Sequence, residues 1–439
     1  MQKRNVQFIS TAKLPCSLQT LQTRDQFDSS AYAAKNIIKR DFAIIGGGAV
    51  GTYAAISLAD QNKTFTLVEV TDQLGGHTKT FQDPTTGATV DYGVQLHLNC
   101  SIVRDVFARS RSPLAALEPS SYGNPEYYDF TKQVALTNYK PGSIQSDCAT
   151  ALNNYPYLED LKHNLSSGST QGGLSWPATP GNPLDTTALA IFNDGNNVEL
   201  EDFEGAAVHG ANNDNSEIYV NALAELKSNV FPQFSIIAAK RALTCKSGVQ
   251  LLIIARPPIL DDTKYFGLDQ QEHAILSKLS GKNYYGGVMN NTGLEEGIAY
   301  TNAGADTQYH VASLPSVAEV EDATRSTIKW LQTENNFTAL EPNFVDYQDF
   351  SPFHLSPPTE DIADGWYGKM KDLQGHRDTW YISSLLVIGS TQVWNSTHTC
   401  FRILSALLSL SAFAGWAIDI QKPLPRRVVP VYVLHSCIA

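Results

Sequence analysis

The glycine-rich segment 46–51 (Gly-Gly-Gly-Ala-Val-Gly) constrains the fold of this chain more than any other feature of its sequence. It follows a short apolar run at 42–45 and precedes an alanine-rich stretch at 52–60, in which apolar residues recur at helical spacing. A second apolar run at 65–70 has the composition of a buried strand. This order of elements predicts a right-handed βαβ unit with parallel strands.

Three glycines in this segment have the spacing G-x-G-x-x-G of a dinucleotide-binding turn. Gly46 permits the tight turn, Gly48 lets the backbone approach a pyrophosphate, and Gly51 allows close packing of the helix on the strand. Ala49 and Val50 directly precede the predicted helix, whose positive N-terminal end attracts phosphate charge. We therefore expect these five residues to line a cofactor site.

Glu69 stands at the end of the second apolar run, 18 residues beyond Gly51. A carboxylate at this point can accept hydrogen bonds from the ribose hydroxyls of an adenine dinucleotide. It would repel a 2′-phosphate, which argues against NADP. The alternative is a surface glutamate that follows an ordinary glycine-rich turn.

Two further glycine-rich segments follow Glu69. Gly75 and Gly76 precede His77, and residues 87–93 read as a short strand and turn that ends at Gly93. These glycines would bring the backbone and the His77 side chain against a long cofactor, which favours an extended FAD over NAD. Taken alone, His77 could be a solvated loop histidine.

Together these segments resemble the motifs of amine-oxidase-type flavoproteins. In that group the first glycine motif is followed by an acidic residue, then by Gly-Gly-[Arg/His]-x-x-[Ser/Thr] and a V-D-x-G turn. The present chain has these features at 46–51, Glu69, 75–80 and 90–93. The resemblance implies FAD as the cofactor and a glutathione-reductase-like FAD fold.

Within this group, the histidine in place of the commoner arginine resembles the β-cyclopiazonate dehydrogenase family of fungal secondary metabolism. Segments 284–293 (YYGGVMNNTG) and 364–375 (DGWYGKMKDLQG) resemble that family as well. A bacterial polyunsaturated fatty acid isomerase is a more distant relative. The resemblance extends over most of residues 40–390.

The fold class implied is α/β, with a discontinuous Rossmann-type FAD-binding domain and an α+β substrate domain. The ranges expected are 41–100, 205–260 and 365–425 for the FAD domain and 101–204 and 261–364 for the substrate-side insertions, with an irregular leader at 1–40 and a tail at 426–439. Outside the βαβ unit, the sequence predicts a helix at 217–228, buried strands at 248–258 and 379–389, and a terminal helix near 397–418.

The implied function is an FAD-dependent oxidoreductase that transfers a hydride from a small organic substrate to the flavin, in secondary metabolite biosynthesis. Oxygen or another acceptor would reoxidise the flavin. One alternative is an isomerase that returns the hydride to another carbon. The other is a flavin-binding protein without turnover, because segments 242–248 and 388–397 depart from the group's usual pattern. The aromatic residues of the insertions suggest an apolar or aromatic substrate.

The sequence assigns no catalytic residue. Tyr284, Tyr285, His97 and His354 are candidates, although each residue type is more often a packing or hydrogen-bonding group. Covalent attachment of the flavin is possible, and His97 and Cys400 are conceivable anchors. The six cysteines lie far apart without zinc-type spacing, so no metal site is expected.

Charge and hydropathy restrict the remaining function classes. The chain has 32 Lys and Arg residues against 44 Asp and Glu residues, so its formal net charge is −12 and nucleic-acid binding is not expected. The longest apolar stretch, 403–418, is shorter than the ~20 residues that a membrane-spanning helix needs. The first 40 residues contain no continuous apolar stretch typical of a signal peptide. We therefore expect a cytoplasmic protein, or a secreted one if the N-terminus is incomplete.

Overall fold

The computed structural model describes fourteen ranges of the chain. They are 4–5, 40–97, 99, 101–116, 124–139, 208–212, 214–235, 251–254, 268–282, 285–302, 316–351, 353–358, 360–361 and 364–382. The terminal helix expected near 397–418, the tail at 426–439 and nearly all of the leader lie outside these residues. Among the described residues, no helix is both long enough and apolar enough to cross a bilayer.

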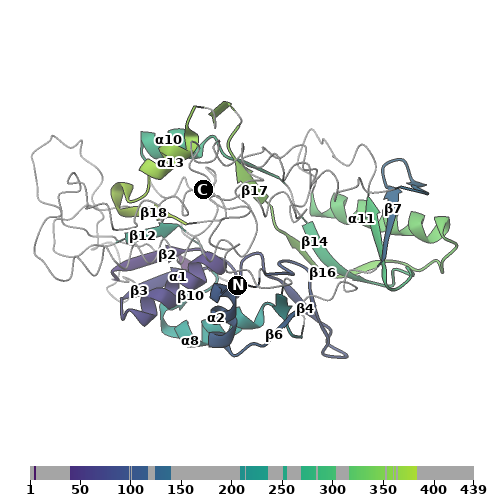
Figure 1. Ribbon diagram of the computed structural model, residues 1–439, viewed down its shortest axis with the longest axis horizontal. Coiled ribbons are helices and arrows are strands. Elements are labelled where there is room, and N and C mark those ends of the chain that lie inside the picture. Colours follow the sequence, from purple (N-terminus) through teal and green to yellow (C-terminus); the bar gives the residue numbers. More distant parts are fainter. Residues whose placement is uncertain are drawn as a thin grey trace, which may run out of the picture.

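A parallel sheet of five short strands forms the centre of the molecule (Figure 1). Its strands, in spatial order, are β10 (Val230–Phe231), β3 (Phe65–Val68), β2 (Phe42–Ile45), β12 (Leu251–Ile254) and β18 (Thr379–Tyr381). Strands far apart in the sequence are neighbours here, so three separated stretches of chain build one sheet.

The predicted βαβ unit is confirmed, with α1 (Ala49–Asp60) joining the parallel strands β2 and β3. The helix begins three residues earlier than the sequence predicts, because Gly48 is its N-cap and the Gly48 carbonyl accepts the first helical hydrogen bond from Thr52 N at 2.9 Å. Strand β3 ends at Val68, so Glu69 directly follows the strand.

Helices cover both faces of the sheet. On one face lie α1, α2 (Ser101–Ser110) and α8 (Glu217–Leu226), and on the other lie α10 (Gln270–Leu276) and α13 (Trp366–Asp372) (Figure 1). Successive strand residues point to opposite faces. Ile44 accordingly belongs to the buried cluster under α1, whereas Ile45 belongs to the cluster under α10.

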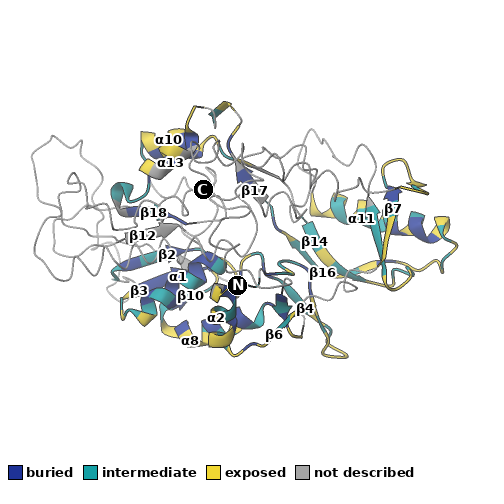
Figure 2. Cartoon of the chain, in the orientation of Figure 1, coloured by how far each residue is buried: buried dark blue, intermediate teal, exposed yellow. Residues whose placement is uncertain are grey.

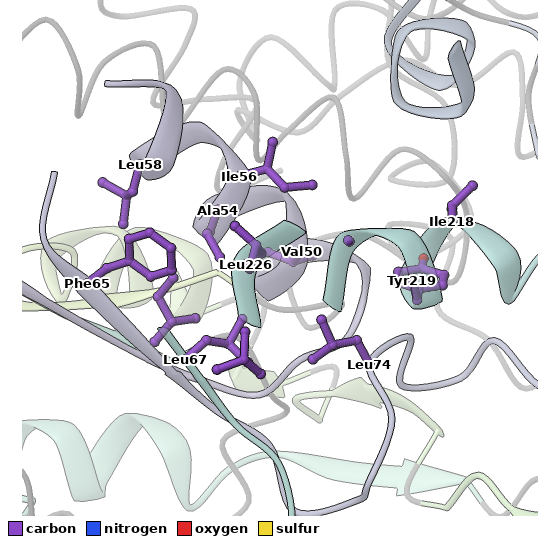
Figure 3. Close-up of a cluster of buried hydrophobic side chains, with 14 of the residues drawn as sticks. Val50, Ala54, Ile56, Leu58, Phe65, Leu67, Leu74, Ile218, Tyr219 and Leu226 are labelled. Carbon is purple, nitrogen blue, oxygen red and sulfur yellow. The ribbon is translucent and has the colours of Figure 1, made fainter. Parts of the chain in front are cut away.

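Among the described residues, most of the buried apolar side chains lie in the cluster between the sheet and helices α1, α2 and α8 (Figures 2 and 3). Figure 3 shows Phe65 and Leu67 of β3 beside α1, with Leu226 of α8 close by. Leu67 is fully buried. Complete burial of such side chains contributes about 2 kcal/mol each, so this cluster fixes how the first glycine turn sits on the sheet.

Two of these helices come from ranges expected in the substrate-side insertions. Val103 and Phe107 of α2, expected in a substrate-side insertion, are fully buried in the same cluster as β2 and β3. Ile275 and Leu276 of α10 similarly pack in one cluster with Ile45 of the central sheet. Helices α2 and α10 therefore pack on the central sheet, and the expected boundaries at 100 and 261 stay predictions. We refer to the central sheet and the helices packed on it as the central body.

The other predicted elements are shorter than expected where they are described. Helix α8 ends at Leu226 and continues as the 3₁₀ turn η5 (Lys227–Asn229). The strands predicted at 248–258 and 379–389 are β12 and β18, and the remaining parts of these two ranges lie almost wholly outside the described residues.

A second group of elements extends away from the central sheet (Figure 1). Here β14 (Tyr285–Asn290) pairs antiparallel with β16 (Asn343–Asp349), and β7 (Asn124–Asp129) lies between β15 (Ile298–Asn302) and β8 (Val134–Ala135). The long helix α11 (Val317–Glu334) accompanies them. We refer to the pair β14 and β16 as the two-stranded ribbon.

Four small sheets and one 3₁₀ turn complete the described elements. The pairs are β1 (Arg4–Asn5) with β11 (Phe234–Ser235), β4 (Thr80–Gln82) with β5 (Thr89–Asp91), β6 (Leu114–Ala116) with β9 (Val208–Gly210), and β13 (Ser280–Lys282) with β17 (Phe353–Ser356), and the turn is η7 (His376–Asp378).

Candidate cofactor-binding site

The glycine-rich turn lies at the carboxyl end of β2. Gly46 has a φ of +102°, a left-handed conformation that favours glycine, and its N–H donates to Val68 O at 2.9 Å. Gly46 thus has the left-handed backbone conformation that a tight turn at this point requires. The first amides of a helix lack intrahelical acceptors, so those of Ala49, Val50 and Gly51 are suited to bind phosphate oxygens.

Glu69 is part of this turn. Its Oε2 accepts a 2.6 Å hydrogen bond from Gly47 N, and its Oε1 accepts a 2.9 Å bond from Thr71 N. The side chain is only 7% exposed, so Glu69 is not the surface residue of the alternative interpretation. Since the carboxylate lies at the carboxyl end of two parallel strands, it stands where ligands of such sheets bind.

Gly47 is absent from the residues that the sequence predicts for the site. A Cβ at this position would lie 2.5 Å from Leu74 Cδ2 and 3.0 Å from Glu69 Oε2. The space beside its backbone is thus filled by Leu74 and by the carboxylate. In the sequence, the run of three consecutive glycines at 46–48 is the feature that could have indicated the close packing around Gly47.

The second glycine pair packs directly on the first turn. Gly75 N donates to Gly47 O at 2.8 Å, and the Gly75 backbone forms a parallel bridge with Gly48. A Cβ on Gly76 would lie 2.9 Å from the Cα of Gly48, and both members of the pair have positive φ values. Only glycines permit two backbones to approach this closely.

Gly93 packs against the backbone of His77, the residue after this glycine pair. A Cβ on Gly93 would lie 2.1 Å from the carbonyl oxygen of His77, which accepts a 3.1 Å bond from Val94 N. The half-buried His77 ring meets Phe350 edge-on at 5.7 Å. Burial, and then the charge of Lys79, lower the pKa of His77, so the imidazole is mainly neutral at pH 7.

The turn at 90–93 is held by a buried polar cluster. Both carboxylate oxygens of Asp91 accept from Asn215 N at 3.1 Å, and Oδ1 also accepts from the Thr80 hydroxyl. The Asn215 amide is fully buried and donates to Val94 O at 2.9 Å. Burial raises the pKa of Asp91 to about 6, although the bond from Thr80 opposes this shift.

The same turn contacts the two-stranded ribbon. Burial, and then the negative charge of Asp346 in β16, raise the pKa of the Tyr92 phenol. A Cβ on Gly286 of β14 would lie 2.9 Å from Tyr92 O and 3.0 Å from the Phe350 ring. This close approach explains why segment 284–293 contains glycine at position 286.

The described catalytic candidates have packing contacts. Tyr285 stacks on Tyr347 at 6.3 Å with an interplanar angle of 22°. His97 is buried, and its ring lies edge-on to that of Phe107 with 5.2 Å between the ring centroids. Burial lowers the pKa of His97 to about 4. These contacts favour a neutral packing residue over a covalent anchor for flavin. Tyr284, Cys400 and the side chain of His354 lie outside the described residues.

One cluster of ligand-type side chains lies beside β18, where Asp269, Glu272 and His376 bring their ligand atoms within 4.8 Å of one another. Arg377 donates to Glu272 Oε2 at 2.7 Å, and the Tyr381 hydroxyl donates to Oε1 at 2.9 Å. The guanidinium already neutralises the buried carboxylate, so this cluster is an ion-pair network that ties α10 to the sheet.

The parallel sheet, the glycine turn and the buried glutamate define a dinucleotide-binding protein of the Rossmann type. In agreement, the family model described as "NAD(P)-binding Rossmann-like domain" matches residues 44–110.

Curated relatives identify the family. The chain is 39% identical over 446 residues to the FAD-dependent oxidoreductase dbaF of Emericella nidulans, covering 88% of this chain and 95% of that protein. It is 30% identical to the FAD-dependent oxidoreductase pigF of Monascus ruber, covering 87% and 95%. The β-cyclopiazonate dehydrogenase of Aspergillus oryzae is 25% identical, covering 83% and 92%. The chain therefore belongs to the family of FAD-dependent oxidoreductases, which confirms the expected cofactor and enzyme class.

Solved structures agree on the fold. A fatty acid isomerase from P. acnes superposes with a TM-score of 0.62 at 13% identity, covering 84% of this chain and 98% of that one. Putrescine oxidase with bound putrescine gives a TM-score of 0.55 at 13% identity, covering 85% and 99%. At this identity the likeness extends to the fold alone.

The described residues fit an adenine dinucleotide of this kind. Among the described residues, a Cβ on Gly48 would have one neighbour within 4 Å, the Cα of Gly76 at 3.8 Å, so the N-cap of α1 leaves room for a phosphate beside Gly48. Glu69 supplies a carboxylate acceptor at the correct end of β3.

Proposed function

We propose that the chain binds FAD through the residues that the sequence singles out. Gly46, Gly48 and the first-turn amides of α1 would hold the pyrophosphate, and Glu69 would accept from the adenosine ribose. The part of FAD between the pyrophosphate and the flavin ring would be lined by Gly75, Gly76, His77 and Gly93. The observation that carries this proposal is the backbone contact between Gly48 and Gly76. The hydrogen bond from Gly47 N to the Glu69 carboxylate supports it.

We propose a glutathione-reductase-like FAD domain for the central body, with the substrate side built by the second group of elements. The assembly of one parallel sheet from three separated stretches supports the discontinuous domain. The packing of α2 and α10 favours including both helices in it.

The proposed reaction is the oxidation of a small apolar or aromatic substrate in fungal secondary metabolism, with oxygen or another acceptor downstream. FAD supplies the hydride acceptor when it is bound. The residues of the chain would orient the cofactor and the substrate and exclude water. Support comes from the names of the curated relatives and from the aromatic contacts of Tyr128, Tyr300 and Trp330 in the second group.

Spectroscopy under nitrogen tests this reaction. The purified enzyme should be yellow, should lose its flavin absorbance when a candidate substrate is added without oxygen, and should regain it in air. An isomerase would turn over its substrate without oxygen uptake or an added acceptor, and a binding protein would stay yellow with every candidate. The expected cytoplasmic location also stays a prediction, which cell fractionation checks.

A further inference from the structure

Thr71 contacts the proposed ribose-binding carboxylate from the loop that joins β3 to the second glycine pair. Its N–H donates to Glu69 Oε1 at 2.9 Å, and its hydroxyl lies 3.0 Å from the same oxygen. The Thr71 hydroxyl also lies 2.7 Å from the carbonyl oxygen of Gln73. The Thr71 carbonyl accepts a 2.7 Å bond from Gln233 N, so the backbone of this residue is held in place by the loop after β10.

These contacts divide the two oxygens of Glu69 between different partners. Each carboxylate oxygen can accept about two hydrogen bonds. Oε1 accepts from the N–H of Thr71 and lies within hydrogen-bond distance of its hydroxyl, whereas Gly47 N is the one donor to Oε2 among the described residues. Oε2 therefore keeps a lone pair for a further donor.

We infer that Thr71 is a positioning residue for the cofactor: it fixes the plane of the Glu69 carboxylate so that Oε2 accepts a hydroxyl of the adenosine ribose. This inference rests on the proposed role of Glu69. The single hydroxyl proton of Thr71 is shared between Glu69 Oε1 and the Gln73 carbonyl oxygen, so the main anchor of Oε1 is the Thr71 N–H. The hydroxyl beside Oε1 limits rotation of the carboxylate. Valine has the shape of threonine without this hydroxyl, whereas serine keeps the hydroxyl.

The test compares two ligands on the full-length chain made without flavin. The ligands are FAD and an FAD analogue whose adenosine lacks the 2′ and 3′ hydroxyls, and binding is followed by quenching of flavin fluorescence. We expect T71V to bind FAD about fivefold more weakly and T71S to bind it within about twofold of wild type. Both variants should bind the analogue as wild type does, because the analogue has no ribose hydroxyl to present to Glu69.

If T71V weakens the binding of FAD and of the analogue equally, Thr71 has only a structural role and the inference is wrong. Unchanged FAD binding by T71V would also overturn the inference. Thermal unfolding of the flavin-free variants checks the fold, and T71A replaces T71V if the latter unfolds. E69A separates this inference from the proposed site. If E69A does not weaken FAD relative to the analogue, the role of Glu69 itself fails. If E69A does and T71V does not, only the role of Thr71 fails.

Discussion

The backbone N–H of Gly47 donates a 2.6 Å hydrogen bond to the carboxylate of Glu69, 22 residues further along the chain. This bond links the turn after β2 to the residue that follows β3. Two elements of the proposed FAD site, the phosphate-binding turn and the ribose acceptor, are therefore one hydrogen-bonded unit. A change in Gly47 or in Glu69 should therefore affect both the phosphate-binding turn and the ribose acceptor.

Gly47→Ala should disrupt this unit. The new methyl group would lie 2.5 Å from Leu74 Cδ2 and 3.0 Å from Glu69 Oε2. We expect a loss of about 1–3 kcal/mol in the free energy of unfolding, and FAD binding at least about tenfold weaker as the carboxylate moves. Gly368→Ala in α13 is the control, because its methyl group meets nothing within 4 Å. Denaturant unfolding and FAD titration measure both effects, and equal behaviour of the two variants would contradict the prediction.

Glu69→Gln should weaken FAD binding by about tenfold to a hundredfold. Whichever way the amide turns, its NH₂ faces either Gly47 N–H or Thr71 N–H, so one donor meets another donor. Glu334→Gln, an exposed residue at the end of α11, serves as the control. FAD titration of both proteins gives the comparison, and equal affinities would remove Glu69 from the site.

Asp91 should make stability depend on pH between about pH 4 and 6. Burial raises its pKa from 3.8 to about 6, so the folded protein binds a proton that the unfolded chain has already released. The stability from this proton is present below about pH 4 and is lost as the pH rises through about 6. The free energy of unfolding of wild type minus that of Asp91→Asn should thus fall by up to about 3 kcal/mol from pH 4 to 7. Urea unfolding at several pH values measures it, and a flat or rising difference refutes the assignment.

Tyr92→Phe should loosen the contact between the turn at 90–93 and the two-stranded ribbon. The variant loses the interaction of the phenol hydroxyl with the Asp346 carboxylate, at a cost of up to about 1 kcal/mol in the free energy of unfolding. Amide hydrogen exchange should rise in β16 and stay unchanged in α1. Tyr139→Phe, at an exposed position, controls for loss of a phenol hydroxyl. Unchanged exchange in β16 would mean that the Tyr92 hydroxyl does not hold the ribbon.

Local patterns were sufficient to predict the βαβ unit and the positions of Glu69, Gly75 and Gly76. Strand, turn and helix signals span only a few residues each, and their order determines that the strands are parallel. Helix α2 (Ser101–Ser110) is not among the predicted elements, and no local pattern reveals that Val103 and Phe107 pack against the sheet.

The contacts that sequence could not predict join residues far apart in the chain. Asp91 and Asn215 are 124 residues apart, and Tyr92 and Asp346 come from the turn and the ribbon. A buried polar pair of this kind depends on the tertiary approach of two segments, and neither segment has a local pattern that encodes its partner.

The flavin content of Gly48→Ala, purified beside wild type, tests the central claim most directly. The added methyl group contacts the Gly76 Cα at 3.8 Å, an ordinary packing distance, so the variant should unfold at the temperature of flavin-free wild type. Gly48 is the N-cap of α1, so the added methyl group would crowd the site proposed for the pyrophosphate. The account predicts that wild type carries FAD and that the folded variant has lost most of it. A folded variant with the full wild-type content of FAD would contradict it.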